Sequence, residues 1–132
     1  MLWVMGGFIN NPLSQYGRVH VTSSTEFVTR EGAVNGPTLI GAHAGHCSVL
    51  FPGNGNVYLI GGGTSNGNKV WVANPSNGFT FTQGPSLMSG RAQHACGTMS
   101  IGTKSIIVAA GGYNLASVEI LDPLSNQWVA GK

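Results

Sequence analysis

Residues 106–128 have the sequence IIVAAGGYNLASVEILDPLSNQW, and this stretch decides the fold. A run of β-branched and small apolar residues ends at a glycine pair, Gly111 and Gly112. A second short apolar run leads to an Asp-Pro dipeptide, and Trp128 follows sixteen residues after the second glycine. Short apolar runs separated by glycine, proline and aspartate predict short strands joined by turns.

The pattern occurs three times in the chain. Glycine pairs close apolar runs at Gly6-Gly7, Gly61-Gly62 and Gly111-Gly112, which are 55 and 50 residues apart. After each pair come a polar loop, a strand-like run (RVHVT, KVWVAN or SVEILD) and a third run that contains an aromatic residue. Residues 36–51 also align without gaps on residues 84–99. A period near 50 residues, with four short strands in each unit, is typical of the blades of a β-propeller.

The composition agrees with an all-β chain and excludes several classes of function. Glycine contributes 21 of the 132 residues, and charged residues make up only 8%, against about 25% in a typical globular protein. The net charge of +2 is scattered and no basic run occurs, so we expect no nucleic-acid partner. No apolar stretch is long enough for a membrane helix, so we expect no membrane partner either. Two cysteines are too few for a disulfide scaffold, and they leave the compartment open.

The repeated residues resemble the kelch repeat. The resemblance rests on the glycine pairs, on Val118-Glu119, on Asp122-Pro123, on Trp128, and on Arg91 with His94 upstream. It implies an all-β, kelch-type β-propeller segment of four-stranded antiparallel blades, with a partial blade at 1–35 and blades at 36–83 and 84–132. Propellers of this family close a ring with more blades than this chain supplies. We therefore expect further kelch blades in the same chain, or self-association, to close the ring.

The repeated glycines and aromatic residues suit a wedge-shaped blade. Glycine permits close backbone approach and positive φ where blades converge on the axis, and the large aromatic side chain fills the wider outer gap. We expect the acidic residues of the third copy to hydrogen-bond the backbone. The predicted structural residues are Gly6, Gly7, Gly61, Gly62, Gly111, Gly112, Glu119, Asp122 and Trp128.

No set of residues predicts catalysis, and we expect neither an enzyme nor a cofactor. Histidines and cysteines gather at His43, His46, Cys47, His94 and Cys96. Neighbouring residues on one strand point to opposite faces, so this cluster is better explained by packed histidines and small buried thiols than by a metal site. A bridge between the two cysteines would need Cα atoms within about 7 Å, which neighbouring inner strands only sometimes allow.

The resemblance implies that ligand contacts come from loops at the mouth of the propeller channel. At the start of the inner strands these are His43 and Arg91, and after the glycine pairs they are Phe8, Tyr113 and Asn114. Arginine suits an acidic peptide through bidentate hydrogen bonds, and tyrosine suits an aromatic anchor. The alternative for Arg91 is an ion pair with a neighbouring blade.

The leading hypothesis is a non-catalytic protein-interaction module that binds a protein or peptide partner at the channel mouth. By analogy of fold, such a module could be the substrate-recognition part of a ubiquitin-ligase adaptor. One alternative is part of a galactose-oxidase-like copper enzyme or of another sugar-processing propeller. The other is a secreted or cell-surface kelch domain in adhesion.

Overall fold

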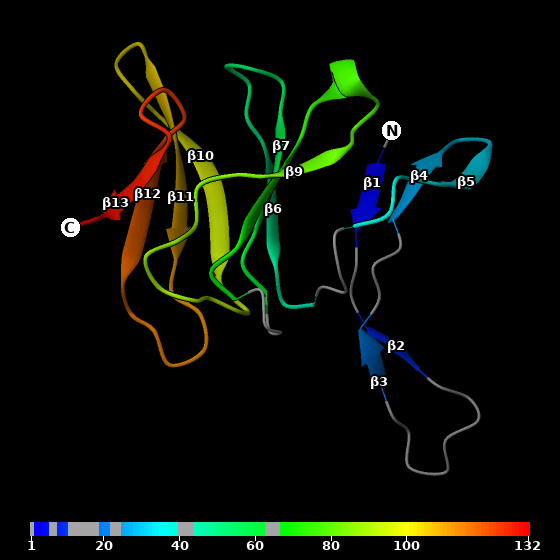
Figure 1. The fold of residues 1–132 in the computed structure, drawn as a ribbon, viewed down its shortest axis with the longest axis horizontal. Helices are drawn as coiled ribbons and strands as arrows, with labels where there is room; N and C mark the ends of the chain where they lie inside the picture. Colours follow the sequence, from blue (N-terminus) through cyan, green and yellow to red (C-terminus); the bar gives the residue numbers. More distant parts are fainter. Residues whose placement is uncertain (1, 6–7, 11–18, 22–24, 40–43, 63–66) are drawn as a thin grey trace. The chain divides into compact units, whose positions relative to one another are not determined.

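The computed structural model describes residues 2–5, 8–10, 19–21, 25–39, 44–62 and 67–132 (Figure 1). These residues form thirteen strands and a single turn of 3₁₀ helix, η1 (Pro75–Asn77), and they contain no α-helix. The chain divides into two compact units, Met1–Ala44 and Gly45–Lys132. Within the described ranges no helix has the length and apolar character needed to cross a membrane.

The first unit contains a three-stranded and a two-stranded antiparallel sheet. The strands are β1 (Leu2–Met5), β2 (Phe8–Asn10), β3 (Val19–Val21), β4 (Thr25–Thr29) and β5 (Gly32–Asn35). The larger sheet has the order β1-β4-β5, and β2 pairs with β3. The sequence analysis predicted a polar loop between the first glycine pair and the RVHVT segment, which is wrong at residues 8–10. Residues 8–10 form a strand that was not expected and that takes the RVHVT segment as its partner, so β1 pairs with β4.

The second unit contains two four-stranded antiparallel sheets, as the repeat predicted. The first has the order β6-β7-β8-β9, from β6 (Cys47–Leu50), β7 (Val57–Ile60), β8 (Val70–Ala73) and β9 (Phe81–Gln83). The second has the order β10-β11-β12-β13, from β10 (Ala95–Ile101), β11 (Lys104–Ala110), β12 (Val118–Asp122) and β13 (Gln127–Ala130). Figure 1 shows the two sheets side by side, with β6 next to β10.

One hydrophobic core joins the two sheets. It contains side chains from one face of each sheet, because residues that share a face are two apart along a strand. The first sheet contributes Val49, Tyr58, Ile60 and Val70, the second contributes Ile107, Ala109, Leu121 and Trp128, and Phe51 and Leu87 complete the cluster. The other face of the first sheet is buried as well, at Leu59, Trp71, Ala73 and Phe81. Phe81 pairs with Ala73 as Trp128 pairs with Leu121, so Phe81 has the place in its sheet that Trp128 has in the second.

The third strand of each sheet ends in the same kind of turn. The Asn74 side-chain oxygen accepts a hydrogen bond from the Ser76 amide at 2.8 Å, and the Asp122 carboxylate accepts one from the Leu124 amide at 3.0 Å. A short polar side chain that binds the backbone two residues ahead mimics a backbone turn, which explains the Asn-Pro and Asp-Pro dipeptides.

Two of the paired glycines lie where a side chain would collide with the backbone. Gly61 has φ 67° and Gly112 has φ 116°, values in the region that favours glycine. A Cβ on Gly61 would meet the carbonyl oxygen of Arg91, and one on Gly112 would lie 2.9 Å from the carbonyl oxygen of Ala92. The glycines thus allow residues 91 and 92 to lie against both sheets.

Candidate functional site

The segment from Gly84 to His94 leads from β9 to β10, and we call it the crossover segment. Backbone hydrogen bonds attach it to the first sheet and to the loops at its end. Gly84 donates to Val70 O and Leu87 to Asn68 O, each at 2.8 Å. Further along, Gly62 N donates to Arg91 O, Arg91 N to Gly67 O, and Gln93 N to Gly45 O, at 2.8, 2.8 and 2.7 Å. These bonds fix the backbone at the place where the channel-mouth loops were expected.

Arg91 connects the crossover segment to the loop between β11 and β12. Its Nε donates to Glu119 Oε2 at 2.8 Å, and its Nη1 donates to the carbonyl oxygens of Gly111 and Ser117, both at 2.7 Å. Its Nη2 donates to Ser117 Oγ at 2.8 Å. The residue is only 1% exposed. An acidic ligand could reach this guanidinium only by displacing Glu119 and the carbonyl oxygens from it. The geometry therefore favours the ion-pair alternative, although the acidic partner belongs to the same repeat as Arg91 and not to a neighbouring one.

Glu119 and Trp128 hold the crossover segment from the side of the second sheet. The Glu119 carboxylate is buried and accepts hydrogen bonds from the Met88 amide at 2.5 Å and the Ser89 amide at 3.4 Å. The Trp128 indole donates its Nε1 hydrogen to Pro85 O at 2.9 Å. A buried carboxylate and a buried indole are thus both satisfied by the same loop, which has no regular structure of its own.

His94 ends the crossover segment and is half-buried. Burial lowers the pKa of its imidazole below 6.5, and the nearby Arg91 guanidinium lowers it further. The backbone of Ile60 and the Glu119 carboxylate oppose these effects more weakly. His94 is therefore a neutral side chain at neutral pH.

Two of the predicted ligand residues, Tyr113 and Asn114, lie in the loop after β11. The Tyr113 side chain is 75% exposed, although its amide is fixed by a 3.0 Å hydrogen bond to Ala92 O. Asn114 is exposed and has φ 59°. The arrangement presents an aromatic ring and an amide side chain to solvent from a backbone that is held in place.

Gln93 is a further exposed polar residue of the crossover segment, although the sequence analysis did not select it. It is exposed, lies in the crossover segment next to Ala92, and has φ 54°. The repeat alignment contained a signal for it, because position 93 corresponds to Gly45, which has φ 65°. Positive φ is uncommon for a residue other than glycine, so the equivalent glycine marks position 93 as a special backbone position.

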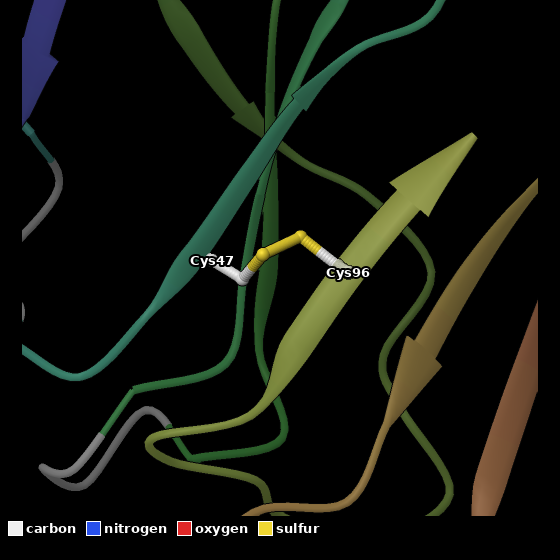
Figure 2. Close-up of a disulfide and its surroundings, with 2 residues drawn as sticks. All are labelled: Cys47 and Cys96. Atoms are coloured by element: carbon white, nitrogen blue, oxygen red, sulfur yellow. A yellow bond between two sulfur atoms is a disulfide. The ribbon is translucent and has the colours of Figure 1, made fainter.

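A disulfide links the inner strands of the two sheets. Cys47 on β6 and Cys96 on β10 are bonded, with their Cα atoms 6.0 Å apart (Figure 2). The expectation of two small buried thiols is therefore wrong, because these neighbouring strands approach closely enough for a bridge. Neither cysteine is available to a metal, and among the described residues no three His, Cys, Asp or Glu side chains converge.

A shallow hollow of about 270 Å³ lies at the other ends of the strands, away from the glycine-pair loops. It is lined by the turns at 51–54, 103–105 and 122–124. The Lys104 ammonium lies 2.6 Å from an Asp122 carboxylate oxygen in its wall. The hydrogen bond from Lys104, followed by that from the Leu124 amide, lowers the pKa of Asp122 below 3.8.

For some of the predicted residues the structure gives no side-chain position. His43, Gly6 and Gly7 fall outside the described residues, and Phe8 lies in β2 without a described side chain. The channel-mouth prediction can therefore be followed only through Arg91, Tyr113 and Asn114.

The structure defines an all-β protein with four-stranded antiparallel sheets. A scan against models of known protein families finds no match to the chain, and a search among curated proteins finds none. The kelch-type assignment rests on the repeated residues and is taken up as a proposal.

Proposed function

We propose that this chain is part of a kelch-type β-propeller and serves as a non-catalytic module that binds a protein or peptide partner. The observation that carries the proposal is Tyr113. A large aromatic side chain is exposed on a loop whose backbone is fixed, so little conformational entropy is lost when a partner covers it. Tyrosine is also enriched among the residues that dominate binding energy at interfaces.

The proposed contact surface consists of Tyr113, Asn114 and Gln93. The ring supplies apolar area, and the two amide side chains supply donors and acceptors that suit a peptide backbone. None of the three is charged, so the surface favours a neutral or polar peptide. Arg91 does not belong to this surface, because its donors are used within the protein.

Selection from a random peptide display library tests the proposal. Peptides enriched on the immobilised chain should lose binding to Tyr113→Ala and keep it to Leu124→Ala, which removes a side chain that is 92% exposed at the other end of the sheet. Truncation of an interface anchor costs about 2 kcal/mol or more, a loss of roughly thirtyfold in affinity. Peptides that bind both variants equally well, or no enrichment at all, would refute the proposed surface.

A second candidate concerns the setting in which the module works. Disulfides persist in oxidising compartments and are rare in the cytosol. The Cys47–Cys96 bridge therefore favours a secreted or cell-surface adhesion domain over an intracellular ligase adaptor. Protein from its natural source is treated with an alkylating agent, with and without prior reduction, and its mass is measured. Alkylation of both cysteines without reduction would show free thiols and would contradict an oxidising setting.

The galactose-oxidase-like alternative has no comparable support. Such a site needs a cysteine that is cross-linked to a tyrosine, and both cysteines of this chain are bonded to each other. Tyr58 is buried with its hydroxyl bonded to Asn54, whereas Tyr113 is exposed. We therefore do not propose a copper enzyme.

A further inference from the structure

The dipeptide Asn-Gly occurs at four places in the chain. These are Asn35-Gly36, Asn54-Gly55, Asn66-Gly67 and Asn77-Gly78. Asparagine in this setting can cyclise, because the next backbone nitrogen can reach the side-chain carbonyl carbon and glycine has no side chain to obstruct the approach. Asn66 falls outside the described residues. The other three pairs differ in how the two reacting groups are held.

Hydrogen bonds hold both reacting groups of Asn54-Gly55, in the turn between β6 and β7. The Gly55 amide donates to Phe51 O at 2.9 Å. Asn54 Nδ2 donates to the Tyr58 hydroxyl at 3.2 Å, and Asn54 Oδ1 accepts from the Asn56 amide at 2.9 Å. Three hydrogen bonds therefore have to break before the glycine nitrogen and the asparagine carbonyl carbon can meet.

The sheet of the first unit holds Asn35-Gly36. Asn35 is the last residue of β5 and pairs with Glu26 on β4. The Gly36 amide, which would be the nucleophile, donates to Thr25 O at 2.8 Å. The Thr25 hydroxyl donates to Pro37 O at 2.7 Å just beyond it. The backbone on both sides of the Gly36 nitrogen is thus fixed to β4.

Asn77-Gly78, between β8 and β9, is held far less. Both residues are exposed, and within the described residues no hydrogen bond involves the Asn77 side chain. The Gly78 amide has no described partner beyond the single 3₁₀ turn η1, a kind of turn with poor hydrogen-bond geometry. Asn77 O accepts an exposed 3.2 Å hydrogen bond from the Thr80 hydroxyl. Gly78 has φ 72° and is free to adopt other values, so this peptide can rotate into the reacting geometry.

We propose that Asn77 is a modification site, at which the folded protein deamidates spontaneously through a cyclic imide. The Gly78 nitrogen gives its proton to solvent and forms a bond to Asn77 Cγ. The bond from Cγ to the side-chain nitrogen breaks, and that nitrogen takes up a proton and leaves as ammonia. Water then adds to one of the two imide carbonyl carbons and opens the ring, which yields aspartate or isoaspartate. The reaction consumes one water, releases one ammonia and involves no oxidation or reduction.

The modification changes both charge and backbone at the turn before β9. A neutral amide becomes a carboxylate, so the formal net charge falls by one from +2. In isoaspartate the main chain runs through the side-chain carbon atoms, which lengthens the turn by one methylene group. Because the reaction needs no enzyme and only accumulates, the modified fraction at position 77 records the age of a molecule. The proposal does not depend on the peptide-binding loops.

A time course of deamidation in the folded, disulfide-bonded chain tests the proposal. After incubation in mildly alkaline buffer, trypsin releases Asn77 in the peptide 70–91, which contains no other Asn-Gly pair. Asn35 and Asn54 share the peptide 31–69 and are distinguished by their fragment masses. An isoaspartate-specific protein carboxyl methyltransferase with labelled S-adenosylmethionine identifies the isoaspartate. Each hydrogen bond that must first break slows the reaction about fivefold, so Asn77 should react at least about tenfold faster than Asn54.

The same time course in guanidinium chloride, with the disulfide reduced, is the control. Without the fold the three pairs have the same chemistry, so Asn35 and Asn54 should accelerate and Asn77 should change little. Asn77→Gln keeps the amide but needs a larger ring, so it should remove the methyl-accepting group from the peptide 70–91. Deamidation of Asn35 or Asn54 in the folded chain as fast as that of Asn77 would overturn the proposal. So would an acceleration of Asn77 by denaturant as large as that of Asn54.

Discussion

The ion pair between Arg91 and Glu119 provides the sharpest test of how the crossover segment is held to the second sheet. In Arg91→Ala, four hydrogen bonds are lost, and the carbonyl oxygens of Gly111 and Ser117 lose the guanidinium donors. The Glu119 carboxylate remains buried with only the backbone amides of the crossover segment as partners. Removing one partner of a buried pair costs about 3–5 kcal/mol because a buried charge is left uncompensated. We expect a loss of that size in the free energy of unfolding.

Urea denaturation followed by tryptophan fluorescence measures this loss. With a slope of about 1–3 kcal/mol per molar urea, the midpoint should fall by about 2 M. Arg30→Ala is the matched control, because Arg30 is exposed and its removal should change the free energy of unfolding by no more than about 0.5 kcal/mol. The double variant with Glu119→Ala should cost less than the sum of the single variants, since the second truncation removes a group that has already lost its partner.

A small effect would refute this reasoning. If Arg91→Ala cost less than about 1 kcal/mol, the range of exposed pairs, the guanidinium would have to be solvated. Arg91 would then again be a candidate for contact with an acidic ligand, as the sequence first suggested.

Three further predictions concern the sheet interface. Trp128→Ala should cost about 3–5 kcal/mol in urea unfolding, because the indole fills the core and binds Pro85 O; a near-neutral result would contradict its place between the sheets. Cys47→Ser with Cys96→Ser should cost about 4 kcal/mol for a sequence separation of 49, by the chain-entropy relation, and unchanged unfolding would mean that the bridge is strained or absent. Because the folded-state pKa of His94 is lowered from 6.5, the unfolded chain binds more protons below that pH, so the free energy of unfolding should fall as the pH decreases from 7 to 5. His94→Gln should reduce that slope, and identical pH profiles would contradict the burial effect.

The repeat made much of the fold predictable from sequence. Glycine pairs, Asx-Pro turns and an aromatic residue recur at fixed spacings, and each reports a local requirement of the backbone or of a packed face. They predicted the two four-stranded sheets, β6–β9 and β10–β13. The first copy was less predictable because Phe8–Asn10 is only three residues long and stands where the other copies have a loop after the glycine pair, and its pairing changed the order of the sheet.

The candidate site was harder to predict for a different reason. Alignment of repeats compares equivalent positions, whereas the contacts of Arg91 join positions that are not equivalent. The same holds for the disulfide, since Cys47 and Cys96 occupy adjacent positions in the alignment and their pairing depends on the distance between sheets. Tyr113 was identifiable because an aromatic residue after a turn glycine has no strand face in which to be buried.

The disulfide also closes a covalent loop around a whole sheet. Cys47 lies on the first strand of the β6–β9 sheet and Cys96 on the first strand of the next, so β7, β8 and β9 all lie between the bonded residues. A protease that cuts once within this loop, for example at the exposed Ser76–Gly78 turn, leaves both pieces attached to each other. A nicked molecule would keep its full mass until it is reduced. In a protease-rich environment, such a protein can be cleaved and still remain one molecule.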